Sequence, residues 1–189
     1  TPVAKAFLSD KGFDGAVMAQ QVFGGHGYIA EWGVEQIVRD VRIAQIYEGT
    51  NGVQAFDLVA RKVMKDGGRG MLDFVEYMRS TELDPVYLEA LEENFVRLIS
   101  VTEGIVERSK TDPDLSGAVS VDYLELVGLV CYAWLWARMA LVAKNDEFGQ
   151  AKKKTAKFFF SRLLPKTLSL EQSISCTSEV LMDLAEESF

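Results

Sequence analysis

Apolar residues recur at intervals of three and four along most of this chain, the spacing of one face of an α-helix. The clearest case is a helix that we expect from the Asp84-Pro85 pair, a typical helix start, to about Lys110. Its apolar stripe consists of Leu88, Leu91, Phe95, Leu98 and Ile105. No segment shows the sustained alternation of a strand. We therefore predict an all-α protein, a helical bundle.

The same periodicity predicts seven further helices, at residues 12–23, 32–44, 50–64, 71–78, 119–144, 147–163 and 166–187. Thr50 or Asn51 is the expected N-cap of the third of these. Inward-facing side chains are expected at Val17, Met18, Val22, Val34, Ile37, Val38, Val41, Val53, Phe56, Ala60, Val63, Leu170, Ile174, Leu181 and Leu184.

The segment 119–144 is apolar nearly all round, which is typical of the central helix of a bundle. Its longest apolar run, residues 126–137, ends at Arg138 and is too short to span a bilayer. We therefore expect a buried core helix and no membrane span. Trp134 and Trp136 are expected to be core and interface aromatics rather than a stacking platform.

Glycine is concentrated early in the chain and divides it into two regions. Residues 1–66 consist of short helices separated by glycines, and residues 71–189 consist of long helices. The sequence KDGGRG at residues 65–70 is the expected linker between the two domains.

Charge and cysteine usage exclude several function classes. The net charge of −8 is unfavourable for nucleic-acid binding, which needs a basic surface. The basic run Lys152–Lys154 is interpreted as a solvated helix face. Cys131 and Cys176 are interpreted as reduced core residues, and the single histidine, His26, has no partners with which to hold a metal.

Two glycine-rich breaks interrupt the early helices: QVFGGHGYIAEWG at residues 21–33 and IYEGTNG at residues 46–52. From the residues alone, each break has two interpretations. It is either a helix end followed by a turn and a cap, since glycine adopts the left-handed conformation freely, or a turn built for close approach. In the second case backbone N–H groups approach a phosphate, and Glu48 projects a carboxylate into a cleft.

Three linked motifs cover these breaks: Q-x-F-G-G-x-G-Y, then V-E-x-x-x-R-D-x-R-I, then I-Y-E-G-T-N. In this order they closely resemble the C-terminal helical domain of the flavin-dependent acyl-CoA dehydrogenases, over roughly residues 1–66. Arg39, Asp40 and Arg42 follow the same pattern. They form either a surface ion network that holds the two turns in register or direct contacts with cofactor or substrate.

The resemblance implies a site built from both turns. It assigns Glu48 as the base that removes the α-proton of an acyl-CoA thioester, while the β-hydrogen leaves as hydride to FAD. Tyr47 and Gly49 are then substrate-binding residues, and His26 is a polar turn residue near the pyrophosphate. The implied FAD contacts, some of them to the flavin of a neighbouring subunit, are Gln21, Val22, Phe23, Gly24, Gly25, Thr50, Asn51, Gly52 and Gln54.

The resemblance also implies what surrounds the chain. The N-terminal helical domain and middle β-domain of the family are missing, so we expect a C-terminal fragment, inactive alone, of the longer subgroup with an appended helical region. Members of that subgroup act on fatty acyl-CoA or on methylmercaptopropionyl-CoA. Expected partners are the acyl-CoA substrate, an electron-transfer flavoprotein and further copies in a dimer or tetramer, in the bacterial cytoplasm or the mitochondrial matrix. The alternative is a non-catalytic oligomerisation or binding module.

Overall fold

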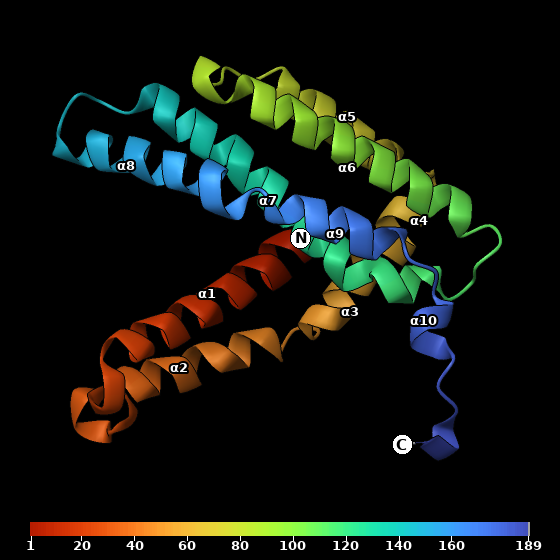
Figure 1. Cartoon of the computed structure of the whole chain (residues 1–189), viewed down its shortest axis with the longest axis horizontal. Helices are drawn as coiled ribbons and strands as arrows, with labels where there is room; N and C mark the ends of the chain where they lie inside the picture. Colours follow the sequence, from red (N-terminus) through yellow and green to blue (C-terminus); the bar gives the residue numbers. More distant parts are fainter. Residues whose placement is uncertain (189) are drawn as a thin grey trace.

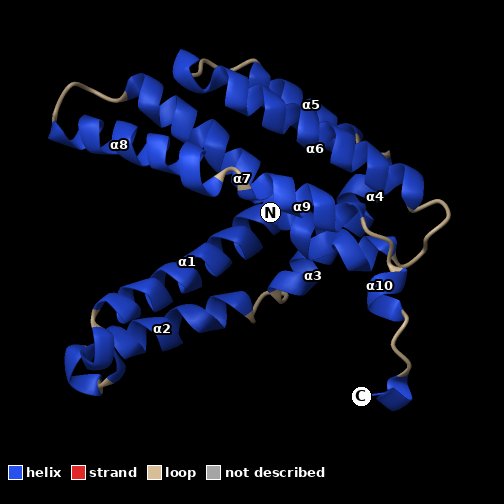
Figure 2. Ribbon diagram, viewed as in Figure 1, coloured by secondary structure: helices blue, strands red, loops and turns tan. Residues whose placement is uncertain are grey.

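The computed structural model describes residues 1–188, and this part of the chain contains helices and no strand, as predicted (Figure 2). The α-helices are α1 (Pro2–Val22), α2 (Val34–Arg42), α3 (Asn51–Phe56), α4 (Met64–Asp66), α5 (Arg69–Arg79), α6 (Leu88–Arg108), α7 (Leu115–Val142), α8 (Glu147–Phe158), α9 (Lys166–Ser175) and α10 (Glu179–Met182). Two π-helical segments, η4 (Asp57–Val63) and η6 (Phe159–Leu163), continue α3 and α8. The 3₁₀ segments are η1 (Gly24–Tyr28), η2 (Ala30–Trp32), η3 (Ile43–Gln45), η5 (Pro85–Tyr87) and η7 (Glu186–Ser188).

Helix α7 is the central helix of the fold, as its all-round apolar sequence predicts. Helices α1, α3, α6, α8 and α9 all pack against it. By length and composition α7 could also cross a membrane, but 61% of its most apolar window is buried inside the protein, as in a core helix. Trp134 is confirmed as a core residue whose Nε1 donates to Thr81 Oγ1 at 2.8 Å, and Trp136 packs half-buried against the core.

A glycine of α7 allows the start of α1 to lie close to the centre of the fold. A Cβ added at Gly128 would come within 2.2 Å of Phe7 Cδ2, so the Phe7 ring rests directly on the α7 backbone. The ring is 2% exposed, and it packs edge-on against Tyr132 with 4.8 Å between centroids. Side chains of both regions of the chain therefore share one core.

Helices α1 and α2 pack against each other as an antiparallel arm that projects away from the core helices (Figure 1). Helix α1 starts at Pro2, well before the predicted residue 12. Gly12 and Gly15 lie inside the helix and do not interrupt it. The prediction that Val17, Met18 and Val22 face inward is wrong: all three are exposed, Val22 at 84%. Along the arm α1 packs against α2 and the short segments η1 and η3, which leave these three side chains exposed.

The other predicted apolar faces are confirmed only in part. In α2, Val34 is buried but Ile37 is exposed. In α3, Val53 and Phe56 are exposed. Val63 is buried as predicted, and the rest of the buried face of the α3–η4 segment consists of Ala55, Leu58 and Val59 instead.

The long helices follow the predicted order, with α8 packed beside α7 and the Asp84 side chain capping the turn that leads into α6. The α6 stripe is confirmed except for Leu88, which is exposed. Lys153 and Lys154 are exposed on α8, whereas Lys152 is half-buried with its Nζ 5.5 Å from the Trp136 ring.

The last predicted helix is wrong in its second half. Helix α9 ends at Ser175, because the Arg108 guanidinium of α6 binds the carbonyl oxygens of Ile174, Ser175 and Cys176. Leu181 and Leu184 are consequently exposed rather than inward. Cys176 is also exposed and is not the core residue that was predicted, while Cys131 is half-buried; both are free thiols.

Candidate functional site

Glu48 occupies a strained position in the turn between η3 and α3. Its φ of 55° makes it the one non-glycine residue with positive φ in the part of the chain described. For a residue with a side chain this left-handed conformation costs about 1–2 kcal/mol, and Gly49 continues it with a φ of 82°. Residues held in such conformations cluster at functional sites. The Glu48 side chain is exposed, so the turn presents its carboxylate to the outside of this chain.

The residues after Glu48 hold the turn together from within. Gln54 Nε2 donates to the Glu48 carbonyl oxygen at 3.0 Å, and its amide lies against Gly49. Thr50 Oγ1 accepts from the Val53 backbone N–H at 3.3 Å, which confirms Thr50 as the N-cap of α3. The Gln54 amide and the Thr50 hydroxyl, implied FAD contacts in the sequence, therefore also maintain the local structure, whereas Tyr47 and Gly52 remain exposed.

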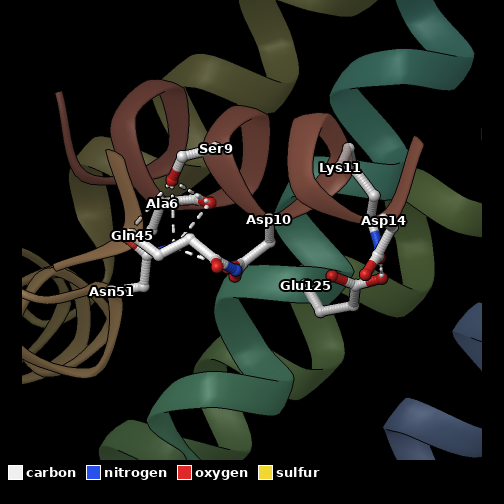
Figure 3. Close-up of polar contacts among 8 residues, drawn as sticks. All are labelled: Ala6, Ser9, Asp10, Lys11, Asp14, Gln45, Asn51 and Glu125. Atoms are coloured by element: carbon white, nitrogen blue, oxygen red, sulfur yellow. Dashed lines mark hydrogen bonds and ion pairs between the residues drawn. The ribbon is translucent and has the colours of Figure 1, made fainter. Parts of the chain in front are cut away.

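Helix α1 holds the same turn from outside through side chains that the sequence motifs do not contain. Asn51 Nδ2 donates to Asp10 Oδ1 at 2.6 Å and to Ser9 Oγ at 3.0 Å (Figure 3). Lys5 Nζ donates to the Gly49 carbonyl oxygen at 2.8 Å. In the sequence these α1 residues resemble ordinary polar positions of a helix surface, and no local signal distinguishes them.

The first glycine break forms the tip of the arm. Gly24, with a φ of 57°, ends α1 as predicted, and no atom lies within 4 Å of a Cβ placed at Gly24 or Gly25. Gly27 is different, because its Cβ would lie 2.4 Å from the Gln20 carbonyl oxygen, so the turn folds back tightly on α1. The side chains of the segment, Gln21, Val22 and Phe23, are exposed.

The structure does not bring the two turns into one place. They lie at opposite ends of α2, whose nine residues separate them by about 14 Å at 1.5 Å per residue. Arg39 pairs with Glu35 inside α2 at 2.7 Å, and Arg42 donates to Gln45 Oε1 at 2.7 Å. Arg42 thus reaches the Glu48 turn through Gln45, whereas Arg39 pairs with Glu35 inside α2 and not with a residue of either turn.

One cavity lies away from Glu48. Its volume is about 560 Å³, and its walls come from the start of α1 and from α7, the α3–α4 segment and α5, with Phe7, Val63, Met71 and Cys131 among the lining residues. No residue of either glycine turn lines it. Within this chain, Glu48 therefore projects from the surface rather than into an enclosed pocket.

Comparison with known families covers nearly the whole chain. Residues 1–64 match the family described as acyl-CoA dehydrogenase, C-terminal domain, and residues 69–185 match the one described as acetyl-CoA dehydrogenase C-terminal like. By class, the chain is thus an all-α C-terminal helical region of a dehydrogenase-type protein. It belongs to the acyl-CoA dehydrogenase family.

Curated relatives match the chain over different extents. The 3-methylmercaptopropionyl-CoA dehydrogenase of Ruegeria pomeroyi is 32% identical over 96% of this chain and 33% of that protein. The broad-specificity linear acyl-CoA dehydrogenase FadE5 of Mycobacterium tuberculosis is 26% identical over 100% of this chain and 34% of its own length. An acyl-CoA dehydrogenase of Bacillus subtilis is 46% identical over 28% of this chain and 14% of that protein. The chain thus spans about a third of the length of the first two relatives.

Proposed function

We propose that this chain is the C-terminal part of an FAD-dependent acyl-CoA dehydrogenase and that Glu48 removes the α-proton of the acyl-CoA thioester. The observation that carries the proposal is the geometry of Glu48, an exposed carboxylate in a left-handed turn that side chains from two helices hold in place. A general base must be fixed within hydrogen-bond reach of the proton that it abstracts. Relatives named as acyl-CoA dehydrogenases support the reaction class.

The exposed apolar side chains of the arm support the view that a larger protein completes the site. Met18, Tyr28 and Trp32 are 64%, 82% and 54% exposed. Contiguous exposed apolar surface marks a contact with other protein. In the proposed enzyme the rest of the dehydrogenase, or a second subunit, covers the arm and encloses Glu48. Residues 1–66 and 71–189 are proposed as its catalytic helical domain and an appended region.

The arm tip fits the cofactor that this reaction requires. Gly24 and Gly25 leave their backbone open to solvent, which allows a phosphate group to approach the main chain closely. We propose that residues 21–25 and the backbone of Thr50 and Gly52 contact FAD. When bound, FAD supplies the hydride acceptor; this chain supplies the carboxylate that takes the α-proton and the turn that holds the carboxylate in place.

The test is the Glu48→Gln variant of the full-length protein, mixed with acyl-CoA thioesters of several chain lengths, methylmercaptopropionyl-CoA among them. We expect flavin reduction to slow by about 10²–10⁴-fold, the usual contribution of a general base, while FAD remains bound. Glu147→Gln, which changes an exposed glutamate in the first turn of α8, is the matched control. Normal turnover of Glu48→Gln would remove Glu48 as the base and favour the non-catalytic assembly module.

A further inference from the structure

One carboxylate on α1 holds both ends of the Glu48 turn. Asp10 Oδ1 accepts from Gln45 Nε2 and from Asn51 Nδ2, each at 2.6 Å (Figure 3). Gln45 precedes Glu48 by three residues and Asn51 follows it by three. Since both amides bind the same oxygen, Asp10 connects the residues on either side of the turn.

The side-chain amide of Asn51 forms its hydrogen bonds with residues of α1. Its two Nδ2 hydrogens are shared among Asp10 Oδ1 at 2.6 Å, Ser9 Oγ at 3.0 Å and the Ala6 carbonyl oxygen at 3.2 Å, and its Oδ1 accepts from Lys5 Nζ at 2.6 Å. A carboxamide has two N–H donors and two acceptor positions. Both N–H donors and the oxygen are engaged within the chain, so the Asn51 side chain anchors the turn.

Lys5 holds the middle of the turn, at the residue that follows Glu48. Its Nζ donates to the Gly49 carbonyl oxygen at 2.8 Å and to Asn51 Oδ1 at 2.6 Å. Charge-assisted hydrogen bonds of this kind are stronger than neutral ones, and Lys5 is only half-exposed. A left-handed glutamate persists only where its surroundings hold it. Lys5 and Asp10 are the charged groups that do so from α1.

We propose that Lys5 and Asp10 are positioning residues for proton abstraction, because they fix the backbone from which Glu48 projects. The inference rests on the proposed function of Glu48. Neither residue is required to touch substrate: each acts through the carbonyl of Gly49 or the amides of Gln45 and Asn51. A displacement of a reacting group by about 1 Å can slow a reaction by about 10²-fold.

The kinetic test compares two lysines on the same helix. Lys5→Met removes the ammonium group that holds the turn, whereas Lys11→Met removes one that pairs with Glu125 of α7 at 2.6 Å instead. In the full-length enzyme, anaerobic flavin reduction by acyl-CoA should slow about 10–100-fold in Lys5→Met, with KM and FAD content near wild type. It should remain within about twofold in Lys11→Met and recover partly in Lys5→Arg, since guanidinium also donates. Asp10→Ala should resemble Lys5→Met.

A second variant separates this inference from the proposed function. In a Glu48→Gln background, Lys5→Met should cause no further slowing, because Lys5 acts through Glu48. If Glu48→Gln is slow but Lys5→Met matches Lys11→Met, the positioning role is wrong and the proposed base stands. If Glu48→Gln turns over normally, the proposed function fails.

A readout without turnover tests the structural part of the inference. Hydrogen–deuterium exchange of the full-length protein, measured on a peptide covering residues 46–56, should become faster in Lys5→Met and stay unchanged in Lys11→Met. The Val53 N–H, bound to Thr50 Oγ1, and the Gln54 N–H, bound to the Thr50 carbonyl oxygen, are the protected amides to follow. Unchanged exchange in Lys5→Met would overturn the positioning role whatever the kinetics show.

Discussion

The contact between Gly128 and Phe7 allows a sharp prediction about stability. In Gly128→Ala the new Cβ would lie 2.2 Å from Phe7 Cδ2 and 2.4 Å from Cγ. The shortest ordinary contact is 3.4 Å, so the ring and the α7 backbone must separate by at least about 1.2 Å, the difference between the two distances. Phe7 is 2% exposed and packs against Tyr132, so the ring can relieve the clash only by moving into the cavity that it lines, which disrupts its packing.

The expected net loss follows from two opposing contributions. Overpacking of a buried site costs about 1–3 kcal/mol, and the upper end applies here because three Phe7 ring atoms lie within 2.6 Å of the new Cβ. Alanine in place of glycine inside a helix returns about 1 kcal/mol. We therefore expect Gly128→Ala to lower the free energy of unfolding by about 2 kcal/mol, measured by urea denaturation of the chain with circular dichroism.

A second helical glycine serves as the control for the contact between Gly128 and Phe7. Gly104 lies inside α6, and no atom lies within 4 Å of a Cβ placed there. Gly104→Ala should therefore be stabilising by up to about 1 kcal/mol. In a Phe7→Ala background the penalty of Gly128→Ala should disappear, since the methyl group then enters vacated space. Equal stability of the two glycine variants, or the same loss without the Phe7 ring, would refute the reasoning.

Two further predictions concern pH and thiol chemistry. The hydrogen bond from Ser178 lowers the pKa of Asp112 below its ordinary 3.8, so the stability it contributes is present above that pH and is lost as pH falls through the folded-state pKa. Urea denaturation at several pH values should show a higher free energy of unfolding for wild type than for Ser178→Ala near neutrality. This difference should shrink below pH 3.8, and a difference that does not change with pH would contradict the reasoning. Burial raises the pKa of Cys131 to about 12, so iodoacetamide near pH 8 should label exposed Cys176 first, by peptide mass spectrometry; equal labelling would contradict this.

Sequence predicts those features of the fold that are set by local chemistry. Asp84 before Pro85, Thr50 before α3 and Gly24 after α1 act at the positions that their residue types indicate. Each of these signals depends on a hydrogen bond or a backbone conformation within a few residues. The central role of α7 could also be predicted, because its apolar surface has to be covered on every side.

Periodicity cannot indicate whether a neighbour exists to cover an apolar face. Met18 and Val22 have the spacing of a buried stripe, yet their side chains are 64% and 84% exposed. The prediction that Leu181 is buried fails for another reason. Arg108, far away in sequence, binds the last carbonyl oxygens of α9, and the helix ends before the periodic pattern does. Both outcomes depend on contacts between distant parts of the chain, which a single sequence does not display.

The candidate site likewise has a part that the sequence predicts and a part that depends on tertiary contacts. The motif around Glu48 is visible in the sequence, but the left-handed conformation of Glu48 and its attachment to α1 are not. Lys5 and Asp10 are separated from Glu48 by roughly forty residues, and they meet the turn only because α1 and α2 fold back on each other. Residues that position a functional group carry no motif of their own.

The two π-helical segments have a consequence for how this chain can change in length. Asp57–Val63 and Phe159–Leu163 each lie in an otherwise α-helical stretch, and both contact α7. A π turn holds one residue more than the α turn it replaces, since its hydrogen bonds span five residues instead of four. Deleting one residue there yields a regular helix with its ends nearly in place. In an alignment of relatives, single-residue gaps should therefore gather at these two segments and spare the α7 residues that face them.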